Sequence, residues 1–109
     1  MDISNINTIV VRGCFCWGKG HSIEEAFEEW LKASRYEQTP DSVNLFFTNA
    51  EPKDVRVTDY GSVTYPQGSE TMHREMLLSD KTKRLIKKAF VLRDNLEEVN
   101  YKISCELSQ

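Results

Sequence analysis

The sequence predicts a small α+β domain in which an antiparallel sheet carries two helices on one face. A β-branched run, a glycine-rich stretch and a strong amphipathic helix signal follow one another near the N-terminus. Strand-type runs then fill the middle of the chain, and a second amphipathic segment follows them. A chain of 109 residues is long enough to bury one adequate core, so we expect a single domain over residues 1–109.

The first strand and the first helix carry the clearest signals. Residues Thr8 to Val11 are β-branched and consecutive, which predicts a strand buried on both faces. Ser22 is a good N-cap, and Glu25 completes a capping box with it. Apolar residues then recur at helical spacing, and they are Ile23, Ala26, Phe27, Trp30 and Leu31.

The stretch Gly13–Gly20 between them is expected to be a loop. Its glycines and Lys19 match most of the phosphate-binding pattern G-x-x-x-x-G-K-[ST], although Gly20 stands where the hydroxyl residue belongs. An alternative function is therefore an enzyme that binds an anion or nucleotide with Lys19 and the amides of the first helix. His21 or Cys16 would act as its acid–base group or nucleophile.

Metal binding is a second interpretation of the same stretch. Cys14, Cys16 and His21 lie close together in the sequence, but no C-x-x-C pair and no second clustered half-site accompany them. Free cysteines are commonly buried, and an odd total of three favours a reducing cytosol. We therefore expect a cytoplasmic protein with no metal and no cofactor.

One run resembles the loop-to-helix signature of HicB-type antitoxins, which have a GC pair, a glycine and then [ST]-x-E-E-A. The matching residues are Gly13-Cys14, Gly18 and Ser22-x-Glu24-Glu25-Ala26. The chain departs from the signature by a two-residue insertion before the cap, and we expect no second strand before the motif. A capping box after a glycine turn produces the same letters, so no family is assigned from this run.

The middle of the chain predicts strands and then a helix. Residues Val43 to Thr48 indicate a second strand with its two phenylalanines on opposite faces. Val55 to Tyr65 alternates like a hairpin with a turn around Gly61. Glu70 to Leu78 favours a helical turn, and Ser79-Asp80 then begins a second helix.

The C-terminal residues 98–107 fit two structures. A half-buried strand is indicated by strict alternation of Val99, Tyr101, Ile103, Cys105 and Leu107 with polar residues. A coiled-coil seam is indicated by Leu85, Ala89, Leu92, Leu96, Val99 and Ile103. The strand would complete a ferredoxin-like order, β-α-β-β(hairpin)-α-(β), with the other sheet face free. The alternative is a long helix through which the chain dimerises.

Function is expected to be binding and not catalysis, because no recognisable catalytic pairing is present. Small acidic proteins with a net charge of −3 are common among regulators and inhibitors, including those of phages and mobile elements. Exposed aromatics beside glycines are typical interface anchors, although at least one of the pair 15 and 17 should fold inward under the helix. The glutamates of the first helix could engage a basic partner. The candidate binding residues are Phe15, Trp17, Lys19, Glu24, Glu28 and Tyr65. A protein partner is expected, and homodimerisation is an alternative that follows if the C-terminal segment is a long helix. A membrane partner is not expected, because no apolar run is long enough to cross one.

Single-stranded nucleic acid on the open sheet face is the other alternative. The segment Tyr60–Tyr65 is similar to the aromatic strand motif of the RNA-recognition module, matching it at Tyr60, Gly61, Val63 and Tyr65. It departs from that motif at the leading basic-glycine pair and at Ser62, which takes the place of the middle stacking aromatic. The resemblance implies that Tyr65 stacks on a base.

Overall fold

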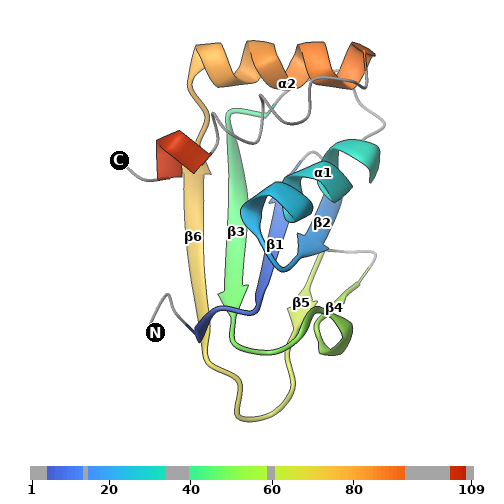
Figure 1. The fold of residues 1–109 in the computed structure, drawn as a ribbon, viewed down its shortest axis with the longest axis vertical. Coiled ribbons are helices and arrows are strands. Elements are labelled where there is room, and N and C mark those ends of the chain that lie inside the picture. The colour runs from blue at the N-terminus through green and yellow to red at the C-terminus, as the bar shows by residue number, and fades with distance from the viewer. Residues whose placement is uncertain (1–4, 14, 34–39, 59–60, 93–103, 108–109) are drawn as a thin grey trace.

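The computed structural model describes residues 5–13, 15–33, 40–58, 61–92 and 104–107, with backbone alone for residues 88–92. Its centre is a four-stranded antiparallel sheet of order β2-β1-β3-β6 (Figure 1). The strands are β1 (Thr8–Gly13), β2 (Cys16–Gly20), β3 (Ser42–Thr48) and β6 (Thr71–Leu77). The helices are α1 (Ile23–Ala33), which packs against β1 and β2, and α2 (Asp80–Leu92), which lies across the end of the sheet. The predicted α+β class is confirmed.

Strand β1 lies between β2 and β3 in the sheet. It pairs antiparallel with β2 on one side and with β3 on the other, so β2 and β3 run parallel to each other. Helix α1 makes the crossover between these two parallel strands, a split β-α-β unit. Thr8, Ile9, Val10 and Val11 are all at most 6% exposed, as predicted for a strand covered on both faces.

The capping box at the start of α1 is present with one change. The Glu25 amide donates to Ser22 Oγ at 3.2 Å, and the His21 amide donates to Glu25 Oε2 at 2.8 Å. The carboxylate therefore reaches one residue further back than the N-cap itself. The predicted apolar face is confirmed, because Ala26, Phe27, Trp30 and Leu31 are buried.

The predicted loop Gly13–Gly20 is wrong, because Cys16–Gly20 forms β2. Glycine is a poor strand former, and it conceals the strand in the sequence. The glycines are required by helix packing. A Cβ atom on Gly18 would lie 2.1 Å from the Ala26 carbonyl oxygen and 2.3 Å from the Trp30 amide nitrogen. Gly18 thus allows α1 to touch the backbone of the strand.

The helical turn predicted for Glu70–Leu78 is also wrong. Residues Thr71–Leu77 form β6, which pairs with β3 along its whole length. Its sequence is rich in good helix formers such as methionine, glutamate and leucine. Pairing with the buried strand β3 overrides that local preference.

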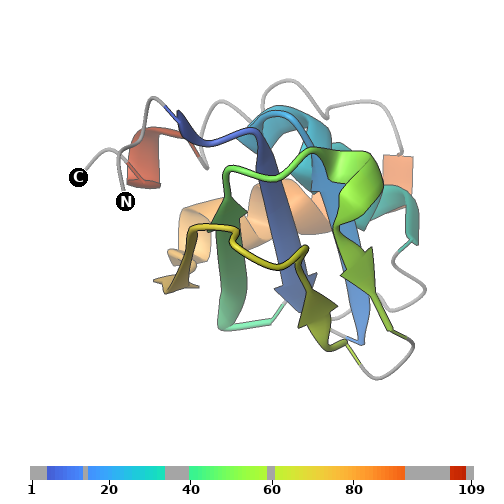
Figure 2. The same ribbon diagram turned by 90° about the horizontal axis from the view of Figure 1, so that it is seen from below.

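The predicted hairpin is confirmed as a separate two-stranded ribbon of β4 (Arg56–Val57) and β5 (Val63–Thr64). A short 3₁₀ turn, η2 (Pro52–Asp54), precedes it. Figure 2 shows the ribbon on the side of the sheet away from α1. Val55 is 1% exposed beside it, and Val10 of β1 is fully buried on the same side. The ribbon therefore covers the second face of the sheet over β1 and β2. The prediction that this whole face is free is wrong.

Residues 104–107 form a helical turn, which contradicts the predicted C-terminal strand there, and residues 98–103 of that prediction lie outside the described residues. Strand β2 occupies one edge of the sheet and β6 the other, so the order differs from the ferredoxin-like arrangement.

Helix α2 begins as predicted, with the Thr82 amide donating to Ser79 Oγ at 3.2 Å. Ile86 of α2 joins the core beneath α1. Of the alternative seam, Leu85, Ala89 and Leu92 lie in α2, whereas Leu96, Val99 and Ile103 lie outside the described residues. Within the described part of the chain, no helix is long and apolar enough to cross a membrane.

Candidate functional site

Phe15 lies at the tip of the β1–β2 hairpin and is 96% exposed. Gly13 pairs with Cys16, so only two residues connect the strands. Two-residue hairpin loops require positive φ angles, which asparagine and glycine adopt most easily. Phe15 nevertheless has a φ of 61°. A large aromatic side chain is thus held in a left-handed backbone conformation and displayed to solvent.

Trp17 and Lys19 lie on the face of β2 that points away from α1. Trp17 is half-buried opposite Arg12. The prediction that Phe15 or Trp17 folds inward under the helix is therefore wrong. Lys19 Nζ donates to the Val55 carbonyl oxygen at 2.9 Å. This contact fastens the ribbon to the sheet.

Glu24 and Glu28 lie on α1, on the other side of the sheet from Trp17. Glu24 Oε1 accepts a hydrogen bond from Ser104 Oγ at 2.9 Å, which links α1 to the C-terminal turn. Glu28 forms an ion pair with Lys32 at 3.3 Å, one turn along the helix. The structure therefore does not bring these glutamates together with the hairpin residues into one site.

Tyr65 follows β5 and is half-buried. Burial raises the pKa of its phenol, because the charged form loses hydration. Tyr65 directly follows β5 of the ribbon and does not lie in a strand of the main sheet. Tyr65 is therefore not part of the sheet surface on which the RNA-recognition resemblance would place a stacking aromatic.

A group of four side chains that sequence reasoning did not single out lies on the second face of the main sheet. We call it the open face, formed by Arg12, Asn44, Phe46 and His73. The Phe46 and His73 rings stack with centroids 4.7 Å apart, and the Arg12 guanidinium lies 5.0 Å from the Phe46 centroid. Asn44 Oδ1 lies 2.9 Å from His73 Nε2. Arg12 also donates to the Gly61 carbonyl oxygen, so it lies between the ribbon and Phe46.

One signal of the open face was available in the sequence. Because side chains alternate along a strand, placing Phe47 in the core puts Phe46 on the opposite face. His73 could not be placed beside it while residues 70–78 were interpreted as a helical turn. The open face thus became visible only once β6 was paired with β3.

A mostly apolar cavity of about 470 Å³ lies on the helix side of the sheet. It is lined by Ile6, Ile9, His21, Ile23, Phe47, Met72, Arg74, Ser104 and Leu107. This volume falls within the usual range of small-molecule pockets. The apolar side chains of β1, β3 and α1 form its floor, and the C-terminal turn borders it.

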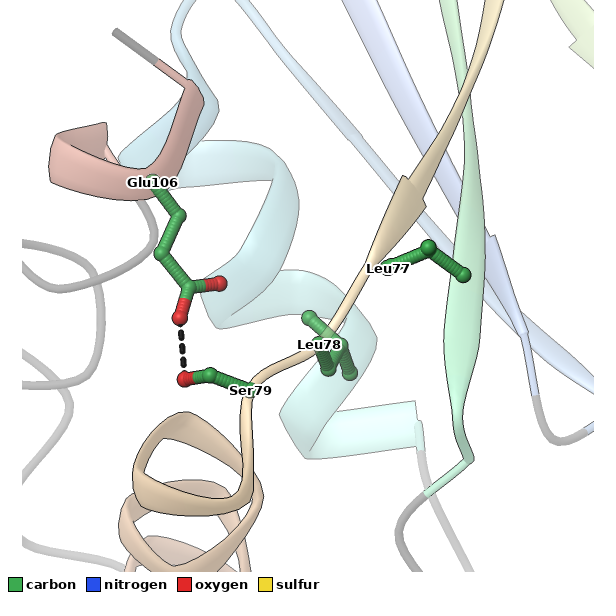
Figure 3. Close-up of a pocket in the computed structure, with 4 residues that line it drawn as sticks. All are labelled: Leu77, Leu78, Ser79 and Glu106. Atoms are coloured by element: carbon green, nitrogen blue, oxygen red, sulfur yellow. Dashed lines mark hydrogen bonds between the residues drawn. The ribbon is translucent and has the colours of Figure 1, made fainter. Parts of the chain in front are cut away.

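A second cavity, of about 310 Å³, lies where β6 leads into α2 (Figure 3). Glu106 reaches into it from the C-terminal turn and accepts hydrogen bonds from Ser79 Oγ and, at 2.6 Å, from Thr82 Oγ1. Its negative charge lies beside the N-terminus of α2, where the helix dipole favours an anion. The other oxygen, Oε2, is buried with no hydrogen-bond partner within the described structure. The carboxylate fastens the C-terminal turn to the β6–α2 junction.

Of the residues proposed for metal or nucleophile chemistry, Cys16 begins β2 and His21 directly follows its other end. Cys16 Sγ donates to the Gly13 carbonyl oxygen at 3.2 Å, and Cys14 lies outside the described residues. Among the side chains that the structure describes, no three of histidine, cysteine, aspartate or glutamate are grouped to hold a metal ion. Comparison of the chain with family models, with curated proteins and with solved structures gives no match.

Proposed function

We propose that the chain is a non-enzymatic protein-binding module that regulates or inhibits its partner by contact, with Phe15 as the anchor of the interface. The observation that carries this proposal is the exposure of Phe15 in a left-handed turn. An aromatic side chain of this kind buries a large area when a partner covers it, and interface hot spots are enriched in such residues.

The backbone strain that this left-handed turn imposes on Phe15 also supports the proposal. A left-handed backbone costs a residue with a Cβ atom about 1–2 kcal/mol. Burial inside the fold does not offset this cost, because the side chain is 96% exposed. Strained residues cluster at functional sites, where the strained geometry serves binding and not folding.

Replacing Phe15 with asparagine is expected to stabilise the isolated protein by about 1 kcal/mol, because asparagine tolerates the left-handed turn. For a domain of this size the melting temperature should rise by about 4–8 °C. Urea or thermal denaturation measures the change. An unchanged or lower free energy of unfolding would mean that the turn does not strain Phe15.

The binding role is tested with the same variant. Proteins captured from the native host by the wild type are identified, and their affinity for the purified variants is measured. Phe15→Asn should weaken binding by at least about tenfold, as the loss of a hot spot does. Phe15→Trp keeps an aromatic anchor and should retain binding. Equal affinity of Phe15→Asn and the wild type for every captured protein would contradict the proposal.

The open face favours a second candidate function, the binding of single-stranded nucleic acid. Stacked Phe46 and His73 rings with an adjacent guanidinium form the kind of platform on which bases stack. Phe46→Ala should weaken binding of a labelled oligonucleotide at low salt by about 1–3 kcal/mol, and Tyr65→Ala should have a smaller effect. Binding should also fall steeply with salt. No binding by the wild type at low salt would eliminate this candidate.

A further inference from the structure

Strand β6 forms an outer edge of the main sheet (Figure 1). It is seven residues long and pairs with β3 in an unbroken register from Ser42–Leu77 to Thr48–Thr71. No strand in the described part of the chain pairs with its other edge. Figures 1 and 2 place the C-terminal turn on the helix side of the sheet. A long unpaired edge of this kind is a template for another strand.

Two hydrogen bonds show which backbone groups of β6 point outward. The Leu78 amide donates to the Asp41 carbonyl oxygen at 2.8 Å, and the Asn49 amide donates to the Glu70 carbonyl oxygen at 3.3 Å. Backbone groups of every second residue point to the same neighbouring strand. Even-numbered residues of β6 therefore face β3. The backbone groups that face outward are those of Thr71, His73, Glu75 and Leu77.

We propose that β6 pairs antiparallel with β6 of a second copy of this chain, in the register centred on Arg74. This proposal does not depend on the role of Phe15. In this register His73 lies opposite Glu75 of the second copy, and Glu75 lies opposite His73 of that copy. Thr71 and Leu77 pair in the same reciprocal way. All four are outward-facing residues, so their amides and carbonyls make the hydrogen bonds of the new ladder.

The side chains favour this register over its neighbours. His73 and Glu75 form two symmetric pairs in which the imidazole can donate a hydrogen bond to the carboxylate across the strands. A shift by two residues would instead place His73 opposite His73 or Glu75 opposite Glu75. The contact of His73 Nε2 with Asn44 leaves its Nδ1 for the second copy. Arg74 lies opposite Arg74 of the second copy at the centre of the interface. These two like charges repel each other and weaken the dimer.

The dimer would join two four-stranded sheets into one of eight strands. The two β2 strands would lie at its outer edges, seven strand spacings or about 33 Å apart. Each hairpin tip with Phe15 would then remain accessible, far from the new interface. The contact is confined to one strand edge, so we expect a weak dimer that dissociates on dilution.

Sedimentation equilibrium of the full chain over a wide concentration range tests the proposal. Glu75→Lys should weaken dimerisation about tenfold, because two attractive pairs are lost. The double variant His73→Glu/Glu75→Lys places a carboxylate opposite an ammonium group in both pairs and should recover dimerisation. Asp54→Lys, an exposed residue on the ribbon side, makes the same change in net charge and should have no effect. Arg74→Thr should tighten the dimer about threefold, because it removes the like-charge pair.

A backbone variant guards against indirect effects of charge. Glu75→Pro removes an outward amide, and proline is tolerated at such positions of edge strands. It should abolish dimerisation while circular dichroism shows the fold retained. A wild type that stays monomeric at every concentration would overturn the proposal. So would a dimer unaffected by both Glu75 variants. Phe15→Asn should leave the dimer unchanged, which separates this test from that of the proposed function.

Discussion

Replacing Gly18 with alanine is expected to destabilise the protein by about 3 kcal/mol or more, a large part of the stability of a small domain. The added Cβ atom would lie 2.1 Å from the Ala26 carbonyl oxygen and 2.9 Å from the Trp30 Cα atom. Both are backbone atoms of α1 and cannot rotate away. The helix would have to move off the sheet, which would open the core around Phe27 and Leu31. Urea denaturation followed by circular dichroism measures the loss.

Gly68→Ala is the matched control. Gly68 has a φ of 86°, but apart from its chain neighbours no atom of the described residues lies within 4 Å of the position of its Cβ atom. Alanine there should cost only the backbone strain of about 1–2 kcal/mol. If Gly18→Ala were no more destabilising than Gly68→Ala, the close approach of α1 to β2 would be wrong.

Replacing Trp30 with alanine is expected to cost about 3–5 kcal/mol, as for other large buried aromatics. Trp30 is 2% exposed, and its ring packs edge-on against Phe27 with centroids 5.9 Å apart. Its Nε1 donates to the Gly13 carbonyl oxygen at 2.9 Å. The variant loses buried area, an aromatic pair and a hydrogen bond to the base of the hairpin.

The slope of the denaturation curve should stay unchanged in Trp30→Ala if the loss is one of native stability alone. Leu77→Ala provides the comparison, because Leu77 is 73% exposed and its removal should change stability by less than about 0.5 kcal/mol. Similar effects of the two substitutions would contradict the burial of Trp30. Trp30→Phe keeps an aromatic ring but loses the hydrogen bond and part of the indole packing, and it should cost about 1–3 kcal/mol.

The elements with agreeing local signals could be predicted from the sequence. In α1 the capping box and the apolar stripe both indicate a helix, and the structure contains both. Strand β3 was predicted within one residue, because its phenylalanines alternate between the faces. Strand β1 was predicted as a strand buried on both faces, and its first four residues are. Each of these segments has the period and composition of its final structure.

The strands β2 and β6 could not be predicted, because contacts with distant parts of the chain determine their extended structure. Gly18 is a poor residue for a strand, and it is required only because α1 packs directly on it. Strand β6 is composed of helix formers and is extended because β3 offers seven partners. Long-range pairing of this kind leaves no periodic trace in one segment.

The candidate binding residues could be predicted only in part, because their exposure and their neighbours also depend on long-range pairing. The sequence marked Phe15 as an aromatic beside glycines, but its exposure depends on a hairpin that was not recognised. Lys19 and Tyr65 stay predictions as binding residues, and the sequence did not indicate that Lys19 would hold the ribbon or that Tyr65 would be half-buried. The open face needed β6 in place before His73 could meet Phe46.

The hydrogen bond from Trp30 to the Gly13 carbonyl oxygen has a consequence for association rates and affinity. It ties the base of the hairpin to the buried helix, only two residues from the tip. A partner would therefore meet a preorganised loop and would lose little affinity to the entropy of ordering it. Cutting this tether with Trp30→Phe should slow association with the partner even where the fold survives.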